Sequence, residues 1–217
     1  MTERDFRIAT TVHGRYLVNE PDDCNAPLLV GFHGYAETAE KHLATLREVA
    51  GTHAWRLCAI QALHPFYKGR SGDVVASWMT RLDRELAIED NVRYVAAVVS
   101  RLAPEASPAK RLVYCGFSQG AAMAYRAAAC GEHSCDAVIV LGGDVPPELA
   151  EEDLGRIPRV LIGRGSGDEW YAETALASDV KRLENAGVAT RTCRFNGGHE
   201  WTAAFRADVG SLLASLA

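Results

Sequence analysis

The sequence predicts an α/β fold in which a mostly parallel, twisted sheet is flanked by helices on both faces. Near-continuous apolar runs at residues 27–32, 111–115 and 137–141 are typical of strands that are covered on both sides. Stretches with apolar residues at helical spacing alternate with these runs, as in βαβ units with parallel strands. A length of 217 residues fits a single domain over residues 1–217 with a sizeable core.

The elements follow in a regular order along the chain. Strands are predicted at residues 27–32, 55–60, 111–115, 137–141, 157–162 and 188–195. Helices are predicted at residues 38–50, 86–102, 121–129, 171–186 and 201–216, with Thr38 as an N-cap. Residues 6–18 alternate around His13-Gly14-Arg15 and predict an antiparallel hairpin at one sheet edge. Residues 62–82 lack periodicity and are interpreted as a long loop, a feature that is often functional.

Composition and charge exclude several classes of function. The apolar share of 48% and the charged share of 24% are ordinary for a globular protein. A net charge of −5 without a Lys/Arg-rich run gives no reason to expect a nucleic-acid partner. No apolar stretch approaches the roughly 18 residues of a membrane span, and the charged start does not resemble a signal peptide.

The six cysteines form no C-x-x-C pair, so we expect neither a metal site nor a redox motif, and no cofactor. Cysteines inside predicted strands are commonly buried and free, which favours a reduced cytoplasmic protein. Cys130 and Cys135 flank a predicted turn, and whether they pair stays open.

Gly116-Phe117-Ser118-Gln119-Gly120 joins a predicted strand to a run of strong helix formers. A strand that becomes a helix at Gly-x-Ser-x-Gly is typical of a nucleophile elbow, which exposes the serine on a strained turn. Side chains at residues 116 and 120 would collide where the strand and helix pass closely. Ser118 is therefore the predicted nucleophile.

A serine hydroxyl needs a base, and the base needs an acid that holds its tautomer. His199 follows the last predicted strand, and Asp168 follows the strand at residues 157–162, so both belong to the same sheet edge as Ser118. Asp144 and Glu169 are rivals for the acid. A zinc-binding H-E-x-x-H motif at His199 is excluded because residue 203 is alanine.

Acyl transfer also requires donors for the developing oxyanion. The backbone N–H of Gln119, which follows the nucleophile, is one predicted donor. The backbone N–H of Tyr35, in the turn after the strand at residues 27–32, is the other.

Together, His33-Gly34-Tyr35-Ala36-Glu37, Gly116-Phe117-Ser118-Gln119-Gly120, Gly165-Ser166-Gly167-Asp168 and Gly197-Gly198-His199-Glu200 resemble the phospholipase/carboxylesterase branch of the α/β-hydrolases, which includes acyl-protein thioesterases. The resemblance implies a serine hydrolase of carboxylic esters or thioesters with the triad and oxyanion donors named above. Two positions depart from the family pattern. Ala36 replaces a second glycine, a mild change provided that residue 36 does not need a positive φ. Glu169-Trp170-Tyr171 follow the acid where the family usually has Pro-Val-Val, which changes the pocket shape.

In the resembled family a tryptophan near the position of Trp78 lies beside the nucleophile. By that likeness Trp78 and Met79 would wall the substrate site together with Trp170, although loop aromatics equally often anchor their loop. The segment between the strands at residues 137–141 and 157–162 is too short for a large cap domain, so we expect an open, shallow site.

Other functions remain as alternatives. A dienelactone-hydrolase-like enzyme normally uses cysteine as its nucleophile, and a peptidase-like enzyme usually carries an added gating domain. A catalytically silent binding protein of the same fold typically lacks a triad residue. The expected partner is a small-molecule ester or thioester, and the sequence leaves a homodimer open.

Overall fold

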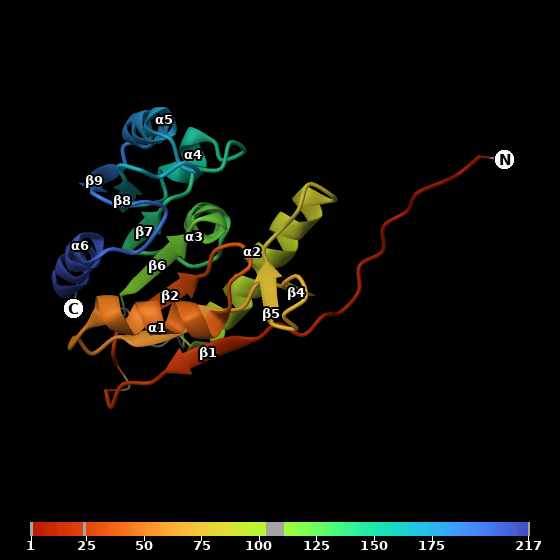
Figure 1. Ribbon diagram of the computed structural model, residues 1–217, viewed down its shortest axis with the longest axis horizontal. Coiled ribbons are helices and arrows are strands. Elements are labelled where there is room, and N and C mark those ends of the chain that lie inside the picture. The colour runs from red at the N-terminus through yellow and green to blue at the C-terminus, as the bar shows by residue number, and fades with distance from the viewer. Residues whose placement is uncertain (1, 24, 103–110, 217) are drawn as a thin grey trace.

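The computed structural model describes residues 2–23, 25–102 and 111–216. Within them, seven strands form one sheet in the order β1-β3-β2-β6-β7-β8-β9 (Figure 1). All neighbours are parallel except β1, which pairs antiparallel with β3. The strands are β1 (Tyr16–Asn19), β2 (Leu28–Phe32), β3 (Arg56–Ile60), β6 (Leu112–Phe117), β7 (Ala137–Leu141), β8 (Arg159–Gly165) and β9 (Ala189–Phe195).

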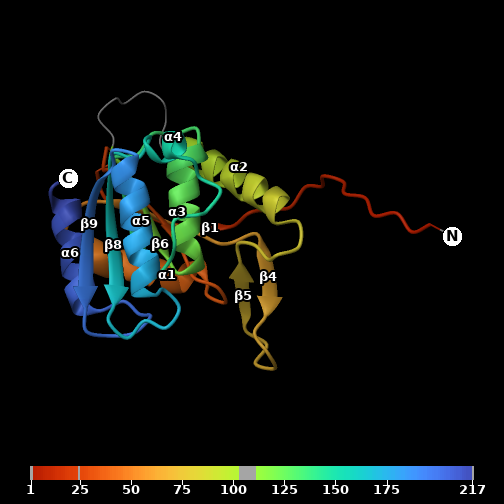
Figure 2. The same cartoon turned by 90° about the horizontal axis from the view of Figure 1, so that it is seen from above.

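Helices cover both faces of this sheet, as the sequence predicts (Figures 1 and 2). On one face, α1 and α6 pack on a core that includes Leu46 and Phe205. On the other face, α2, α3, α4 and α5 pack on a core that includes Val99 and Leu176. The helices are α1 (Ala39–Ala50), α2 (Arg84–Leu102), α3 (Gln119–Cys130), α4 (Glu151–Leu154), α5 (Glu173–Asn185) and α6 (Ala203–Ala214).

The local signals explain where several elements begin and end. Every residue of β2, β6 and β7 is buried, which accounts for their near-continuous apolar sequences. Thr38 is the N-cap of α1, and its hydroxyl accepts a hydrogen bond from Lys41 N at 3.3 Å. The N-cap prediction is confirmed. The other predicted ends lie within a few residues of those observed.

The predicted hairpin over residues 6–18 is wrong. Residues 2–15 form no strand, and Figure 1 shows this segment extending away from the body of the molecule. Its base is held where Tyr94 OH donates to Arg15 O at 2.6 Å. The alternation in this segment is therefore not matched by a partner strand, and β1 alone forms the antiparallel edge.

The interpretation of residues 62–82 as one long loop is also wrong. Here β4 (His64–Tyr67) and β5 (Val74–Ser77) form a separate antiparallel hairpin, which projects beside the main sheet in Figure 2. Each strand has only four residues, and Pro65 lies within β4, so the sequence shows little of the usual strand pattern. No helix in the described ranges is both long and apolar enough to cross a membrane.

Candidate active site

Ser118 lies at the junction of β6 and α3. Its backbone has φ 53° and ψ −121°, a conformation that costs about 1–3 kcal/mol in a residue other than glycine. Ser118 N donates a hydrogen bond to Leu141 O at 2.8 Å, which ties the turn to the neighbouring strand. The surrounding structure therefore holds the serine in a strained turn at the end of a central strand.

Two glycines make this turn possible. A Cβ atom on Gly120 would lie 2.1 Å from Phe32 O, and one on Gly116 would lie 2.3 Å from Gly120 O. Both neighbours are backbone atoms, which cannot rotate away as a side chain can. The predicted steric reason for glycine at these two positions is confirmed.

The Asp168 carboxylate meets the His199 ring, with 2.9 Å between Oδ2 and Nδ1. Its other oxygen, Oδ1, accepts hydrogen bonds from Trp170 N and Tyr171 N, each at 2.9 Å. Burial opposes ionisation of Asp168, but the donors at Tyr171, His199 and Trp170 outweigh it, so the net pKa of this carboxyl is lowered. An ionised carboxylate can only accept, so Nδ1–H of His199 donates to it and Nε2 is left as the basic atom.

Asp144 and Glu169, the other acids considered, are both exposed. Across the described residues, neither of them hydrogen-bonds to His199, whereas Asp168 does. This geometry favours Asp168 over its rivals.

Ser118 and His199 are linked through their surroundings. The ring of Phe117, which precedes Ser118, lies 5.0 Å from the His199 ring between centroids. A Cβ on Gly142 would lie 2.8 Å from the His199 ring, and one on Gly143 would lie 2.5 Å from Ser118 O. Among the described residues, no hydrogen bond joins the Ser118 hydroxyl to His199. Such contacts often tighten only when substrate binds.

The two predicted oxyanion donors are both available. In the described part of the chain, neither Tyr35 N nor Gln119 N donates to a protein acceptor. Gln119 is the first residue of α3, where a helix leaves its N–H groups unpaired.

Sequence reasoning missed the side chains that hold the predicted oxyanion turn in place. Glu37 Oε2 accepts from Gly34 N at 3.0 Å. His33 is fully buried, its Nε2 accepts from Ala62 N at 3.1 Å, and burial lowers its pKa, which keeps the ring neutral. The donors in both contacts are backbone N–H groups, and Ala62 is also distant from His33 in sequence. No sequence motif therefore predicts these contacts.

The condition placed on Ala36 is not met. Ala36 has φ 56°, in the left-handed region that favours glycine. Its N–H donates to Ala76 O at 3.0 Å, and Ala76 N donates to Glu37 O at 3.1 Å. Pairing with β5 thus holds the turn in a conformation that a glycine would adopt more easily.

The three residues expected at the substrate site are placed very differently. Trp78 is 0% exposed, and its Nε1 donates to His33 O at 2.8 Å, so the structure favours its role as an anchor of the loop. Met79 is half-buried, and its carbonyl accepts from Gln119 Nε2 at 2.9 Å. Trp170 is 84% exposed next to Asp168, where a ligand could reach it.

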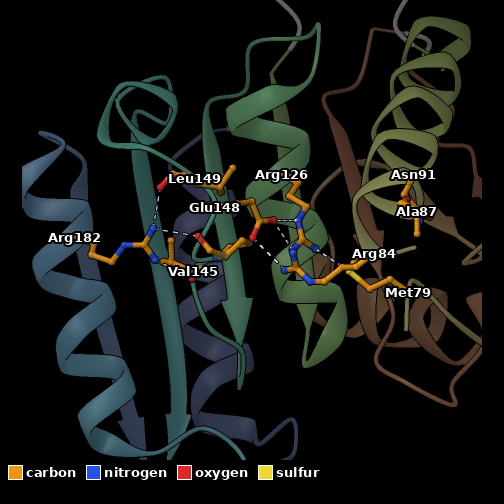
Figure 3. A network of polar contacts seen from close by, with 10 residues as sticks. Met79, Arg84, Ala87, Asn91, Arg126, Val145, Glu148, Leu149 and Arg182 are labelled. Atoms are coloured by element: carbon orange, nitrogen blue, oxygen red, sulfur yellow. Dashed lines mark hydrogen bonds and ion pairs between the residues drawn. The ribbon is translucent and has the colours of Figure 1, made fainter. Parts of the chain in front are cut away.

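A buried arginine ties together two loops on this side of the sheet (Figure 3). Arg126, which is 2% exposed, donates to Glu148 Oε1 at 2.7 Å and contacts Met79 Sδ at 3.5 Å. Arg84 adds a second contact to Glu148 at 3.1 Å. The loop that carries Met79 and the segment after β7 are therefore joined across α3.

A cavity of about 340 Å³ opens beside His199. Phe117 and Trp201 provide its aromatic wall, and charged side chains of both signs surround it. In the described ranges, no cluster of His, Cys, Asp or Glu has the arrangement of a metal site.

Comparisons with known proteins show the family and the fold of this chain. The sequence matches the family model described as Phospholipase/Carboxylesterase over residues 13–169, more than half of the chain. A search of curated proteins gave no match.

Solved structures of low sequence identity share the fold. A carboxylesterase from Bacillus cereus has 17% identity and a TM-score of 0.73, covering 94% of this chain and 95% of its own. Acyl-protein thioesterase 2 from Zea mays has 18% identity and a TM-score of 0.71, covering 94% of this chain and 99% of its own. SOBER1 from Arabidopsis thaliana has 18% identity and a TM-score of 0.72, covering 88% and 99% respectively. These likenesses show the α/β-hydrolase fold.

Proposed function

We propose that this chain, which belongs to the phospholipase/carboxylesterase family, cleaves carboxylic esters with Ser118, His199 and Asp168 as a catalytic triad. The observation that carries the proposal is a serine on a strained strand-to-helix turn at the same sheet edge as half-buried His199, whose Nδ1 lies 2.9 Å from Oδ2 of buried Asp168. This constellation activates a serine hydroxyl for attack on a carbonyl carbon.

In the proposed reaction, His199 Nε2 takes the proton of Ser118 as Oγ attacks the ester carbonyl. The Asp168 carboxylate stabilises the imidazolium that forms. Backbone N–H groups of Gln119 and Tyr35 stabilise the negative charge on the carbonyl oxygen. His199 then protonates the departing alcohol, and a water molecule hydrolyses the acyl-enzyme by the same steps in reverse.

The surroundings of the site support small or extended substrates. Between β7 and β8 the described chain contains only the four-residue α4, which is too small to form a cap over the site. Exposed Trp170 and half-buried Met79 are the proposed substrate contacts, and buried Trp78 anchors the loop that carries Met79. Thioesters are the alternative substrate class that the same chemistry accommodates.

The first test is hydrolysis of short p-nitrophenyl esters by the wild type and by Ser118→Ala. Removing the nucleophile should lower kcat by at least about a thousandfold, and His199→Ala should do the same because triad members act as a unit. Ser166→Ala is the matched control, since it removes an exposed serine on the same sheet edge and should keep wild-type activity.

A fluorophosphonate probe separates an enzyme from a silent binding protein of the same fold. We expect the wild type and Ser166→Ala to be labelled and Ser118→Ala to remain unlabelled. Hydrolysis that persists in Ser118→Ala, or a folded wild type that resists the probe, would remove Ser118 from the proposed role. A series of esters and thioesters of increasing acyl length then defines the preferred substrate.

A further inference from the structure

The segment after Asp168 departs from the pattern of the resembled family, and the structure shows what this segment does here. Tyr171 is 1% exposed and is held at three points. Its N–H donates to Asp168 Oδ1 at 2.9 Å, and its carbonyl accepts from Arg164 Nε at 2.8 Å. Its phenol OH donates to Asp179 Oδ2 at 2.9 Å. The N–H that orients Asp168 therefore belongs to a residue whose other polar groups are all bound.

Asp179 also holds a second loop of the site. It lies on α5, is 5% exposed, and its Oδ2 accepts from Val145 N at 3.1 Å. One turn further along α5, Arg182 donates to Val145 O at 2.9 Å (Figure 3). Val145 closely follows Gly142, where a Cβ would lie 3.1 Å from Asp168 Oδ2 and 2.8 Å from the His199 ring. Asp179 thus connects both loops that contact the Asp168–His199 pair.

We propose that Tyr171 and Asp179 are positioning residues whose hydrogen bond holds the Asp168 carboxylate in the orientation that meets His199. This inference rests on the proposed hydrolase function. Oδ1 of Asp168 is fixed by the backbone donors of Trp170 and Tyr171, which directs Oδ2 to Nδ1 of His199. Displacing residue 171 would rotate the carboxylate away from the ring, and small displacements in such arrangements reduce rates strongly.

The buried position of Asp179 is unfavourable for a charged carboxylate. Burial raises its pKa to about 6, against the hydrogen bonds from Val145 and Tyr171. Asp144 opposes the charge as well, and Arg182 on α5 favours it. An apolar side chain at this position would avoid the desolvation penalty of a buried carboxylate. Stability alone therefore does not account for an aspartate here.

Tyr171→Phe is the direct test because it removes one oxygen atom and keeps the buried ring. We expect kcat for p-nitrophenyl esters to fall about tenfold while KM stays within about twofold, since the reacting geometry changes and the substrate contacts do not. Asp179→Asn keeps an acceptor oxygen but removes the charge, so kcat should also fall, by less than in Tyr171→Phe.

Tyr125→Phe is the matched control. Tyr125 on α3 is fully buried, and within the described residues its OH has no hydrogen-bond partner. Tyr125 belongs to the same hydrophobic core as Tyr171. Burial, and after it the charge of Asp179, raises the pKa of Tyr125. The same chemical change in the same interior should leave kcat unchanged. An equal loss of kcat in Tyr125→Phe and Tyr171→Phe would overturn the proposal, because it would reflect general packing.

A second measurement does not depend on ester hydrolysis. The proton between His199 Nδ1 and Asp168 Oδ2 should give a far-downfield NMR resonance, and the rate of its exchange with water should report how firmly the pair is held. We expect faster exchange in Tyr171→Phe and Asp179→Asn than in the wild type and Tyr125→Phe. Unchanged exchange together with unchanged kcat would overturn the positioning role. If the wild type does not cleave esters, the proposed function fails and the exchange rates still test the positioning role separately.

Discussion

The left-handed backbone at Ala36 is the least expected feature of the site at the scale of single residues. Ala36 has φ 56°, and an L-residue in this region carries a strain of roughly 1–2 kcal/mol. The turn keeps this conformation because Ala36 N donates to Ala76 O at 3.0 Å. The energy needed comes from pairing with β5, which aligns the turn whose Tyr35 N–H is the proposed oxyanion donor.

Ala36→Gly should therefore stabilise the protein. We expect the free energy of unfolding to rise by up to about 1 kcal/mol, since relief of strain outweighs the greater flexibility of glycine in the unfolded chain. Urea unfolding measures this directly. Ala207→Gly is the control, because the same change at an exposed position within α6 should lower the free energy by about 1 kcal/mol. Losses at both positions would show that the Ala36 methyl group contributes contacts that exceed the strain.

The positions of single site residues were predictable where a local sequence pattern marks them. Ser118, Asp168 and His199 each follow a strand of the parallel sheet, and parallel strands bring such residues to one edge. The side chains of Gln119, Tyr171 and Asp179 were not predictable in their roles. Their partners lie on other elements, and only packing brings them together, as when Asp179 on α5 accepts from the Val145 N–H.

At the scale of elements, the close crossing of α3 with β2 positions Ser118, the proposed nucleophile. The helix approaches until only a hydrogen atom fits at Gly120, because a Cβ there would lie 2.1 Å from Phe32 O. The same approach places the N-terminus of α3 beside the turn that contains Tyr35. Separation of these elements would move both proposed oxyanion donors as well as Ser118.

Gly120→Ala tests this crossing. Overpacking against backbone should lower the free energy of unfolding by about 1–3 kcal/mol, measured by urea unfolding, and should also lower esterase activity. Gly198→Ala is the control for stability, since a Cβ at Gly198 would meet no atom within 4 Å and should change the free energy little. Comparable losses in both variants would mean that the crossing is looser than the structure indicates.

The predictability of the elements followed the strength of their periodicity. Strand β7 (Ala137–Leu141) was predicted at its observed bounds, because a run of five buried apolar residues has few other interpretations. The β4–β5 hairpin was missed because each strand has only four residues. Most of β4 is exposed, so its sequence resembles that of a loop. Alternation in residues 6–18 predicted pairing that does not form, since alternation alone does not specify a partner strand.

For the whole molecule, two buried groups make opposite contributions to stability as the pH changes. His42 is 1% exposed between α1 and the sheet, and burial lowers its pKa from 6.5 to about 4. Between pH 6.5 and pH 4, His42 is therefore protonated in the unfolded chain and neutral in the folded protein. The free energy of unfolding falls as the pH is lowered through this range. Burial raises the pKa of Asp179 from 3.8 to about 6, so the folded protein binds a proton first and stability is gained as pH falls from 6 to 3.8.

The pH ranges of His42 and Asp179 overlap, so their opposite effects on the free energy of unfolding largely cancel in the wild type. Substituting either residue alone should make the effect of the other visible. Relative to the wild type, the free energy of unfolding of His42→Gln should rise by about 3 kcal/mol between pH 7 and pH 4, because the loss at the buried imidazole disappears. That of Asp179→Asn should fall by about 2 kcal/mol over the same range, because the compensating gain disappears. Urea unfolding at several pH values measures both differences, with His53→Gln as a control that makes the same change at an exposed position and should run parallel to the wild type. Parallel curves for all three variants would contradict this account, because the two groups would then titrate alike in the folded and unfolded states.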